Sequence, residues 1–336
     1  MKFMDKTIDG VNFFSISNDI GMEFVFSDLG AALYQIYIDG KPMLIGDEDL
    51  RSWMKTKSYF GKTIGRTAGR IRNGDLFYEG KHYKLETNEG TSTLHGGPSG
   101  YAFKKFGCYV ENFGVDGGKY FDVVFHADSP DGDGGYPGNV STKVTYRIYN
   151  GEFRFDIYFD TESDRDTPIS LTSHCYFNLG GYQNVANHSL YVRSSSTTKY
   201  DEHLIPLGFE EIPEDLDFRK LTPLEGRLDA PKLMNHTGGI DHAFMLDERK
   251  ETKEVDVRLE SPEYTLDIYT DFPSVVVYAD NCPTSGRAMN TGYPEERHSG
   301  IAIEPEYVVG DYESMTVKKD KPQRNFIEYH FGRKIK

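Results

Sequence analysis

Four short segments of this sequence combine carboxylate, imidazole and guanidinium groups with glycines or aromatic residues. A carboxylate can accept a proton, and an imidazole can donate or accept one near neutral pH, so these residue types suit general acid–base chemistry. The segments are GRTAGRIRNG (65–74), LHGG (94–97), TSHCYFNLGG (172–181) and IAIEP (301–305).

Taken singly, each of these residues has an ordinary explanation. An arginine among glycines is usually a surface cation, His174 could be a hydrogen-bonded core histidine, and Glu304 could be a solvated strand end. In combination, Glu304, His174 and His95 come from separate segments together with Asp241 and Arg70. Such a set suits a sugar pocket, in which polar groups bind the hydroxyls and aromatic rings cover the apolar face.

The elements that must position these segments are predicted to be β-strands. Apolar residues alternate with polar ones over Glu152–Asp160, and Val140–Tyr149 precedes them as a second strand. Asn150-Gly151 between the two predicts a two-residue hairpin turn with positive φ at both positions. Further strands are predicted at Met22–Phe26, Ala31–Ile38, Phe121–Ala127, Thr265–Thr270 and Val275–Ala279, with at most short helical turns at Glu48–Lys55 and Leu224–Leu228.

No linker, low-complexity tract or repeat divides the chain, although the loop Asp128–Gly138 is rich in turn residues. Tyr and Phe are abundant (23 and 22), and Gly occurs 34 times, which fits pleated sheets joined by tight turns. We therefore expect an all-β protein, a large antiparallel β-sandwich, with residues 1–336 forming a single domain.

Composition excludes several functional classes. The formal net charge is −15 and no Lys/Arg-rich stretch occurs, so we expect no nucleic acid partner. The first 14 residues contain no continuous apolar run and no segment reaches the length of a membrane span, so we expect neither a signal peptide nor a membrane partner. Cys108, Cys175 and Cys282 cannot all pair, which favours a reduced, cytoplasmic protein.

Motifs for nucleotide and hydrolase chemistry are absent from the sequence. There is no Walker loop, no HExxH zinc motif and no G-x-S-x-G nucleophile elbow. Asp131-Gly-Asp133 begins like a calcium loop, but Thr142 occupies the position of the bidentate Glu. We expect no cofactor and no metal; a metal site formed by His95, His174 and His242 is an alternative that no ligand-like spacing supports.

Six motifs, in this order and over nearly the whole chain, resemble the aldose 1-epimerase (galactose mutarotase) family. His-Cys-Tyr-Phe-Asn-Leu with Leu-His-Gly-Gly upstream is the specific part of the resemblance, whereas Asp-His or a single Glu would be weak. The motifs are Gly65–Ile71, Leu94–Gly97, Tyr136–Gly138, His174–Leu179, Asp241-His242 and Glu304.

This resemblance implies a galactose mutarotase-like supersandwich that interconverts the α and β anomers of a free aldohexose such as galactose or glucose. It assigns the general base to Glu304 and the general acid to His174, which requires an ionised carboxylate and a protonated imidazole near neutral pH. The residues that match the family's sugar-binding positions are Arg70, His95, Tyr176 and Asp241. The expected partner is a small-molecule sugar, and the expected state is a monomer or homodimer.

Two alternatives remain open at this point. A hexose-6-phosphate 1-epimerase would use the same acid–base pair but needs cations for the phosphate, for which the candidates are Arg66, Arg72, Lys104 and Lys105. A non-catalytic carbohydrate-binding module would need aromatic and amide groups but has no use for a matched His and Glu.

The sequence also departs from the family pattern at four places. Ser173 replaces an Asn, Gly69 replaces an Asn common in many members, and Val276 stands where a sugar-contacting Gln is common. After Glu304 the sequence reads Pro-Glu-Tyr-Val-Val-Gly-Asp rather than containing a Pro-Asp-Ala turn. None of these changes removes the acid or the base, so they bear on the preferred sugar rather than on the reaction.

Overall fold

Alternating apolar and polar residues form antiparallel strands from the first to the last part of the described chain. The structure is a computed structural model that describes residues 6–113, 118–234, 237–284 and 286–334. The first five residues of the amino-terminal segment, for which we expect no signal peptide, lie outside the described residues.

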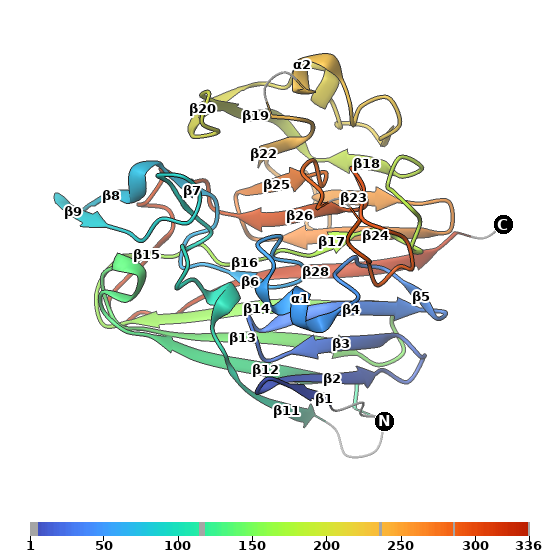
Figure 1. Ribbon diagram of the computed structural model, residues 1–336, viewed down its shortest axis with the longest axis horizontal. Coiled ribbons are helices and arrows are strands. Elements are labelled where there is room, and N and C mark those ends of the chain that lie inside the picture. Colours follow the sequence, from blue (N-terminus) through green and yellow to red (C-terminus); the bar gives the residue numbers. More distant parts are fainter. Residues whose placement is uncertain (1–5, 114–117, 235–236, 285, 335–336) are drawn as a thin grey trace.

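Three large antiparallel sheets carry most of the described strands (Figure 1). In spatial order, the nine-stranded sheet contains β11 (Gly107–Phe113), β12 (Tyr120–Ser129), β13 (Val140–Tyr149), β14 (Arg154–Ser163), β28 (Gln323–Arg333), β24 (Tyr264–Thr270), β23 (Val257–Glu260), β18 (Ser189–Val192) and β21 (Thr222–Pro223). The five-stranded sheet contains β1 (Lys6–Ile8), β2 (Val11–Ser17), β3 (Glu23–Ser27), β4 (Ala32–Ile38) and β5 (Lys41–Pro42). The six-stranded sheet contains β17 (Tyr176–Phe177), β26 (Ile301–Glu306), β25 (Ser274–Tyr278), β22 (Asp241–Leu246), β19 (Ser194–Tyr200) and β20 (Pro206–Glu211).

Four short strand pairs complete the β structure. They are β6 (Thr63–Ile64) with β16 (Thr172–Ser173), β7 (Arg70–Ile71) with β10 (Thr93–Leu94), β8 (Asp75–Tyr78) with β9 (Lys81–Lys84), and β15 (Thr167–Pro168) with β27 (Thr316–Val317). The α-helices of the described residues are α1 (Leu50–Lys55), which Asp49 caps by accepting the backbone N–H groups of Arg51 and Ser52, and α2 (Pro231–Met234). Within the described part of the chain, no helix has the length and apolar character needed to cross a membrane.

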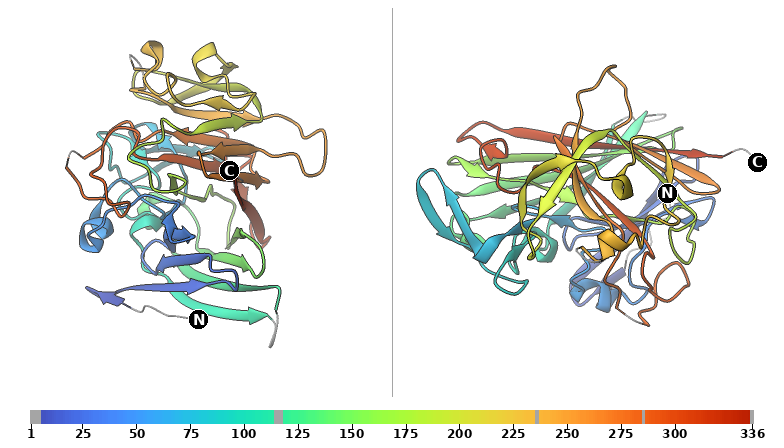
Figure 2. Two further views of the ribbon diagram at one scale, coloured as in Figure 1. Left: turned by 90° about the vertical axis from the view of Figure 1, so that its right-hand side faces the viewer. Right: turned by 90° about the horizontal axis from the view of Figure 1, so that it is seen from above.

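The sheets pack face to face, with the long nine-stranded sheet as one layer and the two smaller sheets as the other (Figure 2). Phe24 of β3 contacts Phe155 of β14 edge to face, with ring centroids 5.4 Å apart. From the six-stranded sheet, Phe177 of β17 lies 5.8 Å from Tyr329 of β28. One continuous apolar core therefore fills the space between the layers, and the all-β sandwich expected from the sequence is confirmed.

Most strand predictions agree with the structure, but the predicted hairpin turn is wrong. β13 has the predicted bounds, and the strands predicted at 22–26, 31–38, 121–127, 265–270 and 275–279 are found within two residues. Four residues, not two, connect β13 to β14, and of the Asn-Gly pair only Gly151 has a positive φ (+74°). Asn150 instead donates its backbone N–H to Lys119 and its amide to Gly118, on the neighbouring hairpin.

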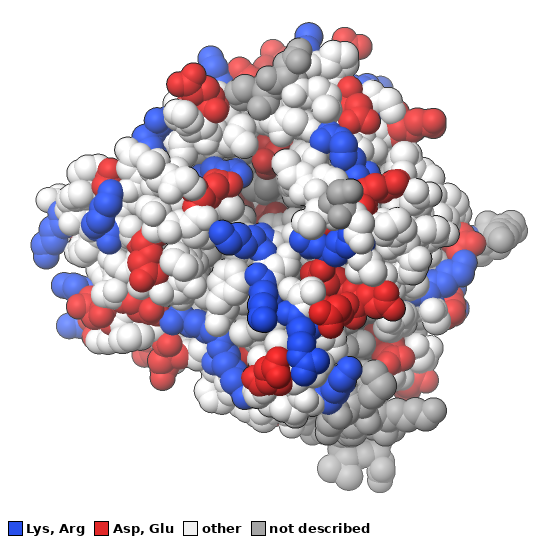
Figure 3. Space-filling view, viewed as in Figure 1, with Lys and Arg blue, Asp and Glu red and all other residues white. Residues whose placement is uncertain are grey.

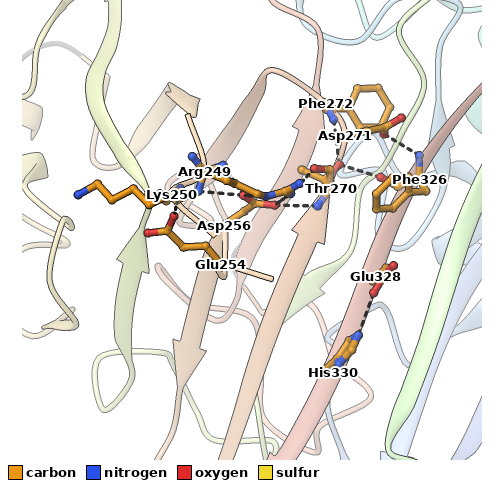
Figure 4. Close-up of polar contacts among 11 residues, drawn as sticks. Arg249, Lys250, Glu254, Asp256, Thr270, Asp271, Phe272, Phe326, Glu328 and His330 are labelled. Carbon is orange, nitrogen blue, oxygen red and sulfur yellow. Dashed lines mark hydrogen bonds and ion pairs between the residues drawn. The ribbon is translucent and has the colours of Figure 1, made fainter. Parts of the chain in front are cut away.

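A buried carboxylate holds the chain where it crosses from the nine-stranded to the six-stranded sheet (Figure 4). Asp256 accepts hydrogen bonds from the backbone N–H of Thr270 at 2.8 Å and from Nε of Arg249 at 3.2 Å. It also accepts Nε of Arg193, the residue between β18 and β19, at 3.1 Å. The start of β19 in the six-stranded sheet is thereby fixed relative to β24 of the nine-stranded sheet.

Candidate active site

A cavity of about 530 Å³ opens on the face of the six-stranded sheet. In the strand register, Glu304 of β26 pairs with Val276 of β25, which pairs with Ala243 of β22. Alternate residues of a strand share a face, so Glu306, Tyr278 and Asp241 point into the cavity as well. These three residues and the three paired ones all line the cavity. Figure 3 shows the hollow near the middle of this face, with acidic atoms inside it and basic side chains around it.

All six residues predicted from the sequence line this cavity. Two lie on the floor, Asp241 at the start of β22 and Glu304 within β26. The others come from the first half of the chain or from β17 and the segment before it: Arg70, His95, His174 and Tyr176.

His174 and Glu304 contact each other at the bottom of the cavity. Nε2 of His174 lies 3.4 Å from Oε1 of Glu304, and the two side chains are 5% and 2% exposed. Nδ1 of His174 and Oε2 of Glu304 have no hydrogen-bond partner among the described residues, which leaves both groups with unused capacity. His174 occupies the connection between β16 and β17. Glu304 was expected at a strand end, but lies inside a strand that is buried throughout.

Burial shifts the pKa values of this pair in opposite directions. It lowers the pKa of His174 to about 3, because the charged imidazolium loses its hydration. Burial also raises the pKa of Glu304 well above its ordinary value; the charges of Glu306 and Asp241 add to this and Arg70 opposes it. Burial therefore favours the neutral forms of both groups, a protonated Glu304 beside a neutral His174, whereas the resemblance implies the charged pair.

His95 is held by a turn that only glycines permit around it. Its own φ is +53°, and its Nδ1 accepts the backbone N–H of Gly69 at 3.2 Å. In the neutral imidazole the remaining proton is therefore on Nε2, which becomes a hydrogen-bond donor. A Cβ at Gly96 would lie 2.0 Å from the carbonyl oxygen of Gly65, so the residue after His95 must be glycine. Burial lowers the pKa of His95 well below its ordinary value, and the charges of His174 and Arg70 add to the effect.

Arg70 and Asp241 provide a donor and an acceptor on one side of the cavity. Glu89 accepts hydrogen bonds from Nε and Nη2 of Arg70 at 2.6 and 3.1 Å, which fixes the guanidinium plane. Nη1 of Arg70 lies 4.0 Å from Oδ2 of Asp241. Burial raises the pKa of Asp241, and Arg70 opposes this shift.

Aromatic rings form the walls around the two histidines. Tyr176 stacks on His174 with ring centroids 5.0 Å apart, and Tyr59 lies 5.0 Å from His95 and 5.7 Å from His174. Such walls suit the apolar face of a sugar ring.

Several residues that line the cavity were missed in the sequence. Glu306 and Tyr278 follow Glu304 and Val276 by two residues, so strand alternation alone could have placed them on the same face. Tyr59 and Glu89 follow no such pattern, because they enter from loops, and Asp280 lies two residues beyond the end of β25. These five residues are part of the cavity wall.

One group of possible metal ligands coincides with this site. Ligand atoms of His95, His174 and Glu304 lie within 4.8 Å of one another. His242, the third member of the metal alternative, is not in this group; its Nδ1 accepts the backbone N–H of Asp241 at 3.2 Å. The metal alternative predicted from the sequence included two of these three residues, His95 and His174. The acid–base and sugar-binding roles predicted from the resemblance include all three.

A second group of possible ligands lies on the nine-stranded sheet and includes the Glu328–His330 pair seen in Figure 4. Its third member, Asp156, is fully buried and already accepts two hydrogen bonds from Arg154 and one each from Tyr149 and Tyr158. Since this carboxylate is satisfied by its neighbours, the group has little to offer an ion.

The departures from the family pattern differ in their relation to the cavity. Val276 lines its floor beside Glu304, whereas Ser173 does not line it and shares a hydrogen bond with Cys175 at 3.2 Å. A Cβ at Gly69 would lie 2.5 Å from Cγ2 of Val309, which explains the glycine there. Of these three positions, Val276 and Gly69 can therefore affect the shape of the site.

The four cations considered for a phosphate do not line the cavity. Arg66 is buried and donates hydrogen bonds to Ser129 and to backbone carbonyls of residues 129–138, so its role is structural. Arg72 pairs with Asp201, Lys104 with Asp133 and Lys105 with Asp28.

Comparisons with known proteins agree with this geometry. The family model described as aldose 1-epimerase matches residues 12–320. A galactose mutarotase from Sus scrofa is 32% identical over 269 residues, 78% of this chain and 74% of that protein. An aldose 1-epimerase from Escherichia coli is 29% identical over 304 residues, 88% of this chain and 85% of that protein. A galactose 1-epimerase structure from Lactobacillus acidophilus, 24% identical, superposes with a TM-score of 0.87 over 99% of both chains.

Proposed function

Because this chain belongs to the aldose 1-epimerase family and is an isomerase with mutarotase activity, we propose that its substrate is a free aldohexose such as D-galactose or D-glucose. The observation that carries the proposal is the buried contact between His174 and Glu304 at the bottom of a cavity of sugar-binding character. Relatives named galactose mutarotase support the choice of a neutral hexose. We also propose that residues 1–336 act as one domain, since residues from Ile16 to Phe331 share the main core.

Anomer exchange requires a base at the anomeric hydroxyl and an acid at the ring oxygen. Glu304 takes the hydroxyl proton, and the electron pair of that O–H bond forms the carbonyl bond at carbon 1. The bond between carbon 1 and the ring oxygen breaks, and His174 protonates the ring oxygen. After rotation about the bond between carbons 1 and 2, the same steps in reverse close the ring on the other face and restore both groups.

The geometry of the pair suits these steps. The two oxygens that exchange protons are attached to the same carbon, so an acid and a base that lie side by side can reach both. One proton is shared by two groups only 3.4 Å apart. Its transfer from Glu304 to His174 creates an ionised base and a charged acid without any exchange with solvent. No cofactor takes part in this sequence of steps.

The sugar is held by the groups around this pair. Arg70 and Nε2–H of His95 donate to hydroxyl oxygens, and Asp241 accepts from hydroxyl groups. Tyr176 and Tyr59 cover the ring. Enclosure of the pair in a buried site strengthens these hydrogen bonds, because little water competes for them.

The two alternatives are less well supported. A hexose-6-phosphate 1-epimerase needs free cations at the phosphate end, but Arg66, Arg72, Lys104 and Lys105 have other partners outside the cavity. A carbohydrate-binding module has no need for a buried His–Glu contact with unused hydrogen-bonding capacity.

The test is polarimetry on freshly dissolved α-D-glucose, α-D-galactose and D-glucose 6-phosphate, with and without catalytic amounts of protein. We expect the two free hexoses to reach anomeric equilibrium faster, with the equilibrium rotation unchanged. A response confined to the phosphorylated sugar would favour the phosphosugar epimerase. Binding of hexoses without any acceleration would favour the module.

A further inference from the structure

Two buried carboxyl groups in the cavity have no use in the proposed reaction. Glu306 and Asp280 line the cavity with 4% and 3% of their surface exposed. Among the described residues, none donates a hydrogen bond to the carboxyl group of Glu306, and Oδ2 of Asp280 is buried without a partner. Burial of a carboxyl group with no hydrogen-bond donor beside it lowers the stability of the folded protein. Two such groups in one ligand pocket therefore indicate a role in binding.

Their positions place them on opposite sides of Glu304. Glu306 follows Glu304 by two residues on the same face of β26, about 7 Å away along the strand. On the neighbouring strand β25, Tyr278 pairs with Ala302, which precedes Glu304 by two residues. Asp280 follows Tyr278 by two residues, so it lies on the side of Glu304 opposite to Glu306. A sugar that has its anomeric carbon at Glu304 and extends toward the end of β26 brings a remote ring carbon close to Glu306.

Among the described residues three cations line the cavity, and the two arginines among them are paired with carboxylates. Arg70 is held by Glu89 and Asp241. Nε of Arg287 lies 3.2 Å from Asp47 and 3.3 Å from Glu295. Lys57 is exposed at the mouth.

The raised pKa of Glu306 indicates that no positive charge lies beside its carboxyl group. Burial raises the pKa of Glu306 to about 8, and the charge of Asp241 adds to the shift. Among the described residues, neither Arg70 nor another cation offsets this effect. A cation bound beside this group would restore its ionised form and form a charge-assisted hydrogen bond.

We propose that the cavity accepts amino sugars, with Glu306 as the counterion for a protonated amino group on a ring carbon remote from the anomeric carbon. An ammonium group donates three hydrogen bonds and carries the positive charge that is missing beside Glu306. A hydroxyl group donates one hydrogen bond and carries no charge. Glu306 is then a specificity-determining residue for substrates that carry this group. The inference rests on the proposed function, since it takes Glu304 as the position of the anomeric carbon.

The experiment compares 3-amino-3-deoxy-D-glucose with D-glucose as substrates, followed by polarimetry near neutral pH. For each substrate kcat/KM is measured for the wild type, for Glu306→Gln and for the matched variant Asp280→Asn. Both substitutions remove one buried carboxyl group from the same cavity and keep the side-chain shape. We expect Glu306→Gln to lower the ratio of amino sugar to glucose by at least about 10-fold, and Asp280→Asn to leave that ratio within about 2-fold.

Each other outcome overturns the inference in a recognisable way. An unchanged ratio in Glu306→Gln means that Glu306 does not bind the amino group. Equal losses in both variants mean that only the general negative potential of the cavity matters. Turnover of D-glucose without any turnover of the amino sugar by the wild type removes the substrate class and leaves the proposed function intact. If neither D-glucose nor D-galactose responds, it is the proposed function that fails.

Discussion

Nε2 of His174 lies 3.4 Å from Oε1 of Glu304, and among the described residues neither group has another hydrogen-bond partner on its free side. Two ionisable groups at this separation share one proton, because a second proton would place an uncompensated positive charge in a buried site. The rate of anomer exchange therefore depends on both groups as a unit.

Replacement of Glu304 by Gln should lower kcat by about 10²–10⁴-fold, because the amide cannot accept the anomeric proton. The KM for D-glucose should change by less than about 3-fold, since the side-chain shape is kept. The measurement is steady-state polarimetry with D-glucose. Glu162→Gln, on an exposed position of β14, is the control for loss of a carboxylate and should retain full activity. Near-normal turnover of Glu304→Gln would remove Glu304 from its role as the base.

The pH dependence of kcat/KM should follow the lowered pKa of His174 and the raised pKa of Glu304. The active form holds one proton on the pair. A second proton enters only near the lowered pKa of His174, about 3, so activity should stay flat in mild acid. Loss of the shared proton follows the raised pKa of Glu304 and should cause a fall on the alkaline side. The uncatalysed reaction, which accelerates in base, is subtracted.

Glu306 also titrates in this range, with a pKa of about 8, and must be separated from the pair. The profile of Glu306→Gln should keep an alkaline limb, because that limb belongs to Glu304. An acid limb near the ordinary pKa of a glutamate with an alkaline limb near that of a free histidine would show that burial does not control the pair.

Replacement of Gly96 by Ala should disrupt the turn that presents His95. The added Cβ would lie 2.0 Å from the carbonyl oxygen of Gly65, so the backbone must move. Gly132→Ala is a matched control, since Gly132 has nearly the same φ (+87° against +85°) but nothing within 4 Å of an added Cβ. Both variants carry the strain of a left-handed alanine, about 1–2 kcal/mol.

Only Gly96→Ala should also lose most of its activity and a further part of its thermal stability. The measurements are the melting temperature and kcat/KM with D-glucose. Equal effects of the two substitutions would show that the close approach to Gly65 does not matter.

Replacement of Asp280 by Asn should raise the melting temperature at alkaline pH. Burial raises the pKa of Asp280 to about 8, and the charge of Glu295 adds to this. A raised carboxyl pKa gives stability that is fully present below the unfolded value and lost as the pH rises through 8. The neutral amide does not undergo this loss. The melting temperature of the variant minus that of the wild type should therefore increase by about 2 °C or more between pH 5 and pH 9.

Asp128→Asn, at an exposed position, is the control and should show the same pH dependence as the wild type. A difference between Asp280→Asn and the wild type that stays constant from pH 5 to pH 9 would contradict the prediction.

Much of the site was accessible from the sequence because its motifs are local. His95 with Gly96 and Gly97, and His174 among aromatic residues, predicted two of the cavity walls from short runs of residues alone. The resemblance to the family pointed to Glu304, and strand alternation could have added Glu306.

The protonation of the site could not be predicted in this way. The pKa of His174 depends on how completely other elements enclose it, and enclosure is a property of the packed sheets. The turn at Asn150 was mispredicted for a related reason, since its hydrogen bonds go to the neighbouring hairpin rather than across its own.

The position of β28 has a consequence for the order in which the protein is made. This strand lies between β14 and β24 in the nine-stranded sheet, yet both neighbours precede it in the chain. During synthesis, two groups of strands leave the ribosome before β28, which joins them: β11–β14, and β24 with β23, β18 and β21. Until β28 follows, β14 and β24 are each left with an unpaired edge. Such edges can pair with other chains. We expect nascent chains stalled before residue 323 to depend on chaperones far more than completed chains do.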